Sequence, residues 1–133
     1  MVTIEKRVPS VEEFRAIAEA VDWLDHFDWP TIPAALDASL FSVVAVDEGT
    51  AVGVARVVGD GVRYFYVQDV MVHPDSSDEG IATDLTRAVL DWIETTSAPK
   101  AFIGLFASPD AEGVYEEFGF STADMTGMHR LIG

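Results

Sequence analysis

The stretch Val70–Leu85 reads VMVHPDSSDEGIATDL and joins an apolar run to an amphipathic segment. The apolar run is typical of a β-strand, and Pro74 ends it. A polar turn then leads through Gly80 into a segment whose apolar residues have helical spacing. A strand, a glycine-bearing turn and a helix N-terminus form an anion site from backbone N–H groups and the helix dipole. This turn nevertheless contains no Lys or Arg, and it carries Asp75, Asp78 and Glu79.

The composition places this turn in a strongly acidic protein. The chain of 133 residues contains 23 acidic and 8 basic residues, a formal charge of −15, and 49% of it is hydrophobic. This length and apolar content predict a single globular domain over residues 1–133. The charge argues against binding to nucleic acids or anionic membranes, which need clustered Lys and Arg. The acids are scattered from Glu5 to Asp124, as in proteins of salt-accumulating halophiles, where a Debye length of about 3 Å at 1 M salt screens self-repulsion.

Several kinds of site and segment are not expected. The chain has no cysteine, which excludes disulfides and thiol catalysis. Its N-terminus lacks an apolar signal core, and no apolar run reaches the length of a membrane span. No spacing of His, Asp and Glu indicates a metal site. We therefore expect a cytoplasmic protein without a metal ion.

Hydrophobic periodicity predicts an alternation of strands and helices. Ser10 and Glu13 form a capping box that opens the first helix, and Asp47-Glu48-Gly49-Thr50 is a hairpin turn. An aromatic segment and a short helix through Leu40 precede the hairpin. Strands are expected at Val2–Val8, Phe41–Asp47, Ala51–Val58, Val62–Val72, Ala101–Phe106 and Met125–Ile132, and further helices at Gly80–Thr95 and Pro109–Phe118.

This order predicts an α+β (mixed α/β) domain. We expect a central mixed, mostly antiparallel twisted sheet of about six to seven strands, with about four helices on both faces. In such sheets a ligand binds where the topology switches, beyond the carboxyl end of a strand. Here that point is the loop from Val72 to Gly80.

Two separated motifs resemble the GNAT superfamily of acyl-CoA N-acyltransferases. The first is VMVHP followed after five residues by GIATDL, and the second is VYEEFGF at Val114–Phe120. The resemblance covers nearly the whole chain. Family members usually carry Arg or Gln, two residues, Gly, one residue, then Gly or Ala in the pyrophosphate loop. Gly80 and Ala82 match this pattern, whereas Ser77 departs from its first position.

The resemblance implies acetyl-CoA as cosubstrate. It places the pantetheine arm along the backbone of Val70, Met71 and Val72, as a peptide adds to a sheet edge. Ser108 stands where relatives often carry Asn, so its hydroxyl could contact the arm. The pyrophosphate would receive backbone N–H groups from the turn and the helix start, which are Asp78, Glu79, Gly80, Ile81, Ala82 and Thr83.

The resemblance also assigns a general acid. The tyrosine of the second motif, Tyr115, lies near the thioester sulfur in relatives and protonates the leaving thiolate. The alternative is that Tyr115 only packs its helix against the sheet. Asp69, a carboxylate inside the apolar strand VQDVMV, is the candidate general base, directly or through a water. It could instead hydrogen-bond the backbone at a bulge, and Gln68, His73 and Tyr66 are further candidates.

The acceptor pocket is expected behind the first helix. There, aromatic residues alternate with acids in WLDHFDWP, which suits a cationic amine with some apolar bulk. The same segment could simply cover the core. The predicted pocket residues are Trp23, Phe27, Trp29, Tyr66 and Gln68.

Taken together, the residues and the resemblance predict an N-acetyltransferase. It would transfer acetyl from acetyl-CoA to a primary amine of a small acceptor, by direct attack in a ternary complex. The alternative is a GNAT-shaped coenzyme-binding or regulatory module that has lost catalysis, which the acidic turn and the missing Arg or Gln suggest. A closing strand after Gly119 could support a homodimer.

Overall fold

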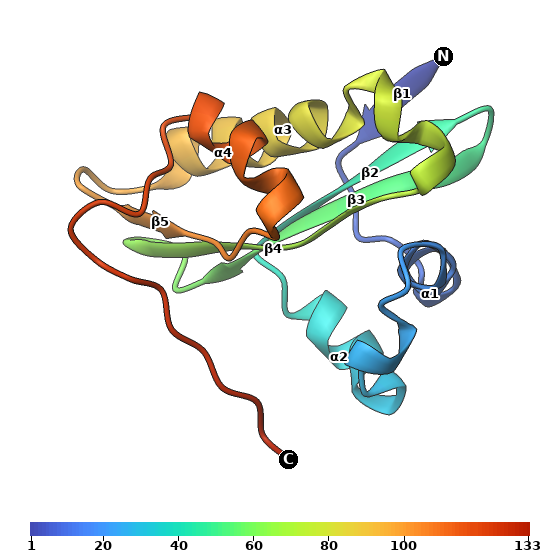
Figure 1. Cartoon of the computed structure of the whole chain (residues 1–133), viewed down its shortest axis with the longest axis horizontal. Helices are drawn as coiled ribbons and strands as arrows, with labels where there is room; N and C mark the ends of the chain where they lie inside the picture. The colour runs from blue at the N-terminus through green and yellow to red at the C-terminus, as the bar shows by residue number, and fades with distance from the viewer.

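The computed structural model describes residues 1–77 and 80–133 with their side chains, and residues 78 and 79 by their backbone alone. Four α-helices and five strands follow one another along the chain (Figure 1). The strands are β1 (Val2–Glu5), β2 (Phe41–Asp47), β3 (Thr50–Gly59), β4 (Tyr64–Val72) and β5 (Phe102–Gly104). The helices are α1 (Val11–Ala20), α2 (Ile32–Asp37), α3 (Ile81–Thr96) and α4 (Glu112–Glu117). Short 3₁₀ helices lie at Leu24–His26, Trp29–Thr31, Pro74–Glu79 and Pro109–Ala111.

The strands form one sheet in the order β1-β2-β3-β4-β5. β1, β2, β3 and β4 pair with one another in antiparallel fashion, and only the pair of β4 and β5 is parallel. The prediction of an α+β fold with a mixed, mostly antiparallel sheet and four helices is therefore confirmed. The parallel step occurs at β4, as the sequence predicted.

The predicted number of six to seven strands is wrong, because the described residues form five. The expected closing strand at Met125–Ile132 is not formed, and this segment runs away from the sheet as an extended tail (Figure 1). An extended segment becomes a strand only where another backbone supplies hydrogen bonds. The tail has no such partner strand within the described part of the chain.

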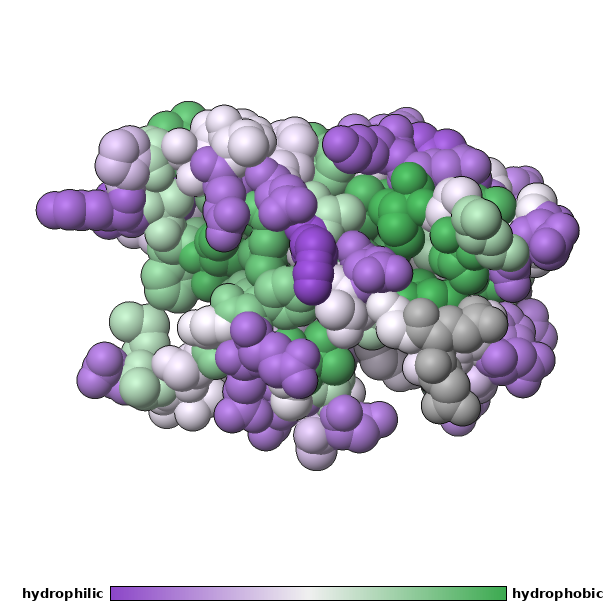
Figure 2. Space-filling model, turned by 90° about the horizontal axis from the view of Figure 1, so that it is seen from above, coloured by the Kyte–Doolittle hydropathy of each residue, from purple (hydrophilic) through white to green (hydrophobic). Residues whose placement is uncertain are grey.

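Helices cover both faces of the sheet. On one face, α3 buries Ile81, Leu85, Val89 and Ile93 against the inward residues of β2, β3 and β4. On the other, α1 and α2 enclose a second core that includes Phe14, Ile17 and Leu36. Seen from the side of α3 and α4, hydrophilic residues lie at the edges and across the middle of the face, with hydrophobic residues showing between them (Figure 2).

The first helix begins as its sequence predicts. Ser10 Oγ accepts the Glu13 N–H at 3.1 Å, and Glu13 Oε1 accepts the Ser10 N–H at 2.9 Å. This reciprocal capping box satisfies two backbone donors that the helix itself cannot pair. Among the described residues, no helix has the length and apolar character that crossing a membrane requires.

Candidate active site

The pairing of β4 with β5 ends partway along β4, where β5 itself ends. Their parallel register runs from Tyr64↔Phe102 to Tyr66↔Gly104 and ends there, whereas β4 continues for six more residues to Val72. Gly104 makes the last pairing close, because a Cβ at this position would lie 2.7 Å from Cε1 of Tyr66. Beyond this pair, Val70–Val72 face the loop that follows β5.

A hollow of about 270 Å³ lies at this separation. It brings together five residues that the sequence predicted for the site: Trp23, Val70, Met71, Val72 and Ser108. Two further residues, Val21 and Asp110, complete its lining. Neither was predicted from the sequence, although Val21 lies two residues before Trp23 and Asp110 follows Ser108 by two residues. The hollow therefore lies between the predicted acceptor segment, which contributes Trp23, and the predicted pantetheine strand, which contributes Val70–Val72.

The turn before α3 presents open backbone. Gly80 has φ +70°, and a Cβ built there would meet nothing within 4 Å. Gly80, the N-cap of α3, supplies no capping side chain. The first-turn N–H groups of Ile81, Ala82 and Thr83 have no intrahelical partner, as at any helix start. Asp78 and Glu79 were predicted at the same turn, and their side chains lie outside the described residues. This helix start can bind an anion through backbone donors and its dipole.

Gly53 sets the position of that helix start. It pairs with Val72 at the end of β4, and a Cβ on Gly53 would lie 3.0 Å from Leu85 Cδ1 and 3.1 Å from Ile81 Cγ2. The missing side chain therefore lets α3 approach the sheet beside Val70–Val72. A glycine inside the apolar run Ala51–Val58 signals such an approach, and the sequence analysis did not use it.

Asp69 lies at a β-bulge. Its φ is +55°, and the β3–β4 register shifts between Val54 and Arg56. Before the bulge Phe65 and Val67 face α3, whereas after it Met71 faces the core under α1. The extra residue thus reverses the alternation of β4 and keeps the carboxylate out of the apolar core beneath α3.

Arg56 holds the bulge in place. Its Nε donates to Asp69 Oδ2 at 2.7 Å, and its Nη1 donates at 3.2 Å to the Ala35 carbonyl and to Ser39 Oγ. The two charged side chains are 18% and 13% exposed, so water screens their attraction only in part. Arg56 therefore links the C-terminal part of α2 to the strand that lines the hollow. Arg56 was not predicted as a site residue, because it lies thirteen residues before its partner in the sequence.

Tyr115 is buried on α4. Its ring packs against Phe120 with 6.2 Å between centroids, and burial raises the pKa of its phenol. A raised pKa keeps the phenol protonated near neutral pH, as a proton donor requires. Its hydroxyl has no hydrogen-bond partner among the described residues and is not a fully enclosed atom. Tyr115 is not part of the lining of the hollow.

The predicted acceptor residues separate into two groups. Phe27 and Trp29 pack on Phe14 with ring centroids 5.3 and 6.1 Å away, and Trp29 Nε1 donates to the Leu24 carbonyl at 2.9 Å. These two aromatics therefore contribute to the core over α1. Trp23 is partly exposed and lines the hollow. Tyr66 and Gln68 lie on β4 outside its lining, before the bulge.

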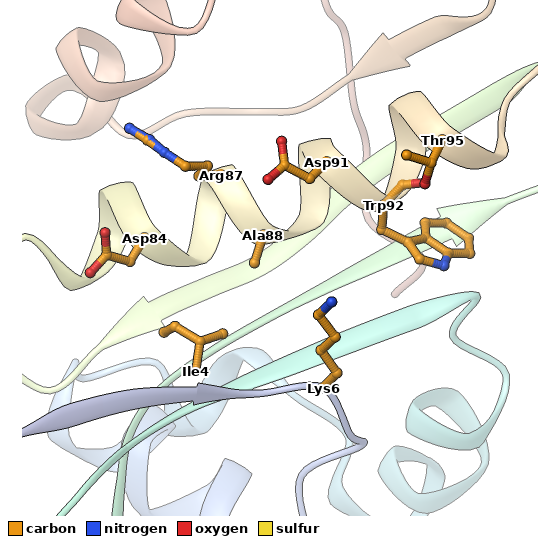
Figure 3. A pocket seen from close by; sticks show the side chains of 8 residues that line it. All are labelled: Ile4, Lys6, Asp84, Arg87, Ala88, Asp91, Trp92 and Thr95. Carbon is orange, nitrogen blue, oxygen red and sulfur yellow. The ribbon is translucent and has the colours of Figure 1, made fainter.

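A larger hollow of about 460 Å³ lies elsewhere, between β1 and α3. Figure 3 shows that Ile4 of β1 and Lys6, which directly follows β1, point toward α3, while Arg87 points away from β1. None of the predicted site residues lines it. Among the described residues, no group of three or more His, Asp or Glu side chains could hold a metal ion.

Comparison with known proteins identifies the family. The acetyltransferase (GNAT) family matches residues 8–120. None of the curated proteins compared with the chain matches it.

Solved structures share the fold along the whole chain. A protein of unknown function from meticillin-resistant Staphylococcus aureus superposes with a TM-score of 0.90 at 23% identity, covering 99% of this chain and 100% of its own. A GNAT family acetyltransferase from Streptococcus pneumoniae gives 0.83 at 29% identity, covering 99% and 98%. AAC(6′)-Iy, in complex with the bisubstrate analogue CoA-S-monomethyl-acetylneamine, gives 0.71 at 18% identity, covering 100% and 99%. The family match spans most of the chain, and the chain therefore belongs to the acetyltransferase (GNAT) family of enzymes.

Proposed function

We propose that this enzyme transfers an acetyl group from acetyl-CoA to the primary amine of a small acceptor, by direct attack in a ternary complex. The hollow at the β4–β5 separation carries the proposal. Its lining joins the strand residues Val70–Val72 and Ser108 to Trp23 of the acceptor segment. A thioester and an amine could therefore meet in one place.

The residues of this chain fit coenzyme A. The start of α3, where the N-cap is Gly80, offers backbone donors to the pyrophosphate. Val70, Met71 and Val72 extend beyond the end of β5 and would pair with the pantetheine arm, with Ser108 opposite. Bound acetyl-CoA would supply the acetyl group as a reactive thioester.

Tyr115 and Asp69 take the two proton transfers in this proposal. As the acceptor nitrogen gains the acetyl group, it loses a proton to Asp69, directly or through water. The Tyr115 phenol, which burial keeps protonated, gives its proton to the departing sulfur. Arg56 supports the first step, because it fixes the Asp69 carboxylate at the bulge.

Substitution kinetics test these roles. Tyr115→Phe should lower kcat by roughly 10²-fold or more, the usual effect of losing general acid catalysis, and leave coenzyme affinity near that of the wild type. Tyr64→Phe is the matched control and should leave kcat unchanged, since Tyr64 is a half-exposed tyrosine at the end of β4 that lies away from Val70–Val72. Equal kcat for Tyr115→Phe and wild type would remove Tyr115 from the mechanism.

Asp69 needs a test that separates a base from a structural carboxylate. Asp69→Asn keeps the shape of the side chain and removes the proton acceptor. If Asp69 is the base, kcat falls and the acid limb of the pH–rate profile changes, because a general base acts only after it has lost its proton. A change in stability or in KM for acetyl-CoA, with an unchanged pH profile, would assign Asp69 to holding the bulge.

The acidic surface makes salt part of the proposal. We propose that the charge of −15 is an adaptation to concentrated salt, in which acids near the phosphate turn repel the pyrophosphate only weakly. Calorimetry with acetyl-CoA at ~0.1 and ~2 M KCl should give an affinity that holds or rises with salt. A steep loss of affinity at high salt would contradict the adaptation. No binding at either salt concentration would favour the decayed, non-catalytic module.

A further inference from the structure

A groove lies between the first strand and helix α3. It is the hollow of about 460 Å³, with Ile4 and Lys6 on the strand side and residues between Asp84 and Thr95 on the helix side (Figure 3). It shares no lining residue with the hollow at the end of β5. The acetyl transfer proposed above does not use this groove, so a separate role is open to it.

The strand that forms one wall of the groove is an open edge. β1 is the first strand in the sheet order, and its outer side pairs with no strand within the described part of the chain. Antiparallel pairing with β2 uses the backbone N–H and C=O groups of alternate β1 residues, so the groups of the residues between them point outward. Such an edge is a template on which another extended chain can add a strand.

The length of the groove suits an extended peptide. Its helix wall runs from Asp84 to Thr95, and at 1.5 Å per residue this is about 16 Å. An extended chain rises by about 3.4 Å per residue and covers the same length in about five residues. The wall opposite, from Val2 through Lys6, also has the length of a short strand.

Apolar side chains form the inner part of the groove. Ile4, Ala88 and Trp92 are all half-buried there. Trp92 stacks on Phe41 of β2, with 4.9 Å between the ring centroids and 3° between the ring planes, so its position is fixed from behind. A strand added to β1 would direct alternate side chains over this apolar surface.

The helix wall is acidic. Asp84 and Asp91 are exposed, and neither forms an ion pair with another described residue. Arg87 points away from β1 and lies over the Phe118 ring, with its guanidinium carbon 5.3 Å from the ring centroid (Figure 3). The two acids therefore face a single base, Lys6, in a chain whose total charge is −15. This charge favours a basic peptide over an acidic one.

We propose that the β1 edge and the α3 wall bind an extended basic segment of a partner protein by strand addition. The backbone of the segment pairs with the outer edge of β1. Its Arg or Lys stems lie over Ala88 and Trp92, and their charged ends reach Asp84 and Asp91. The backbone hydrogen bonds supply affinity, and the two acids select basic side chains. A second copy of this acidic chain is a poor occupant, because two charges of −15 repel.

A heptapeptide that alternates Arg and Val is the probe. Val favours the extended backbone, and Arg places positive charges at every second position. With fluorescein on its N-terminus and an amide at its C-terminus, this probe has no primary amine and cannot accept an acetyl group. Its binding is therefore independent of the proposed acetyl transfer. Fluorescence anisotropy at ~0.15 M KCl should show saturable binding, and the matched peptide that alternates Glu and Val should bind at least tenfold more weakly.

Backbone methylation tests the strand addition itself. Successive residues of a strand point their N–H groups to opposite sides, so the N–H groups of either the Arg or the Val positions meet β1. N-methylation at one of these two sets should weaken binding at least tenfold, and methylation at the other set should leave it within about twofold. Binding of the unmodified probe should also slow amide hydrogen exchange of outward N–H groups in β1, measured by NMR. Two methylated probes that both bind like the unmodified peptide would refute strand addition.

Neutral substitutions on α3 locate the bound peptide. The double variant Asp84→Asn/Asp91→Asn should raise the Kd of the Arg–Val probe at least fivefold at ~0.15 M KCl, and by less at ~1 M KCl, where salt screens the attraction. Glu94→Gln is the matched control, because Glu94 is an acid of the same helix outside the lining of the groove, and it should leave Kd unchanged. All three acids are exposed, so the variants should fold, and far-UV circular dichroism checks this.

Three results would overturn the proposal. The Arg–Val probe could fail to bind, or the Glu–Val peptide could bind as tightly. The double Asn variant could bind the probe with the Kd of the wild type, which would place the peptide outside this groove. Outward β1 amides that are already protected from exchange without peptide would assign the edge to another copy of the chain.

Discussion

Replacement of Gly53 by Ala should destabilise the protein because α3 packs directly over this position. The new Cβ would lie 3.0 Å from Leu85 Cδ1, 3.1 Å from Ile81 Cγ2 and 3.2 Å from the Met71 carbonyl oxygen. Leu85 and Ile81 are fully buried, so neither side chain can move into solvent. Each neighbour must shift by a few tenths of an ångström within a close-packed core.

The expected cost follows from overpacking. Adding one methyl group to a filled core lowers the free energy of unfolding by about 1–3 kcal/mol. Replacing a glycine within a strand raises it by roughly 0.5–1 kcal/mol, because the unfolded chain then has less conformational freedom to lose. We therefore expect a net loss of about 1–2 kcal/mol, which for a chain of this size lowers Tm by roughly 3–8 °C. Acetyl-CoA should also bind more weakly, since the shift tilts the start of α3 away from Val72.

Urea denaturation at constant KCl measures the change, with Gly113→Ala as the control. Gly113 lies in α4, and a Cβ there would meet nothing within 4 Å. The same chemical change should therefore stabilise by a few tenths to about 1 kcal/mol through helix propensity. A Gly53→Ala variant as stable as the wild type, or shifted in the same direction as Gly113→Ala, would refute the packing argument.

Three further predictions concern the turns and ion pairs of the fold. Arg7 binds Glu13 through two hydrogen bonds of 2.7 and 2.9 Å and lowers the pKa of that carboxyl to about 2. The contribution of this pair to the free energy of unfolding is complete above the ordinary Glu pKa near 4.5 and is lost as the pH falls toward 2. Glu13→Gln should therefore reduce the loss of stability at acid pH, measured by denaturation at several pH values, by about 1 kcal/mol, because the pair is partly exposed. Gly59→Ala places a Cβ in collision with the Tyr64 carbonyl oxygen at φ +147°, and chemical denaturation should show a loss of about 3 kcal/mol or more. Arg56→Ala leaves the largely buried Asp69 carboxylate without its guanidinium, and we expect a loss of about 2–4 kcal/mol in urea melts, with Arg56→Lys recovering part of it.

Local chemistry in the sequence predicted several elements correctly. The capping box of Ser10 and Glu13 and the hairpin turn at Asp47–Thr50 depend on neighbouring residues only, and both form. The strand and helix joined through Gly80 also form as the pattern predicts. Near the site, the predicted pantetheine residues Val70–Val72 share one segment and line one hollow, and their role in binding stays a prediction.

Contacts between distant segments could not be predicted. The pairing of Arg56 with Asp69 and the approach of Leu85 to Gly53 depend on how β3, β4 and α3 are placed. The strand predicted at Met125–Ile132 is not formed for the same reason, because an apolar extended segment becomes a strand only where it can reach the edge of a sheet. The assignment of Phe27 and Trp29 to the acceptor pocket stays a prediction, and their packing on Phe14 depends on the path of the chain after α1.

The sequence by itself determined the acidic surface, the strand–turn–helix around Gly80 and the positions of the two family motifs, since these follow from composition and near neighbours. Tertiary structure alone decided that β4 reverses its faces at Asp69, and that Val21, Trp23, Ser108 and Asp110 meet at one hollow. The physical reason is that backbone preference and hydrophobic period act over a few residues. Burial, ion pairing and surface charge act between whichever residues the fold places side by side.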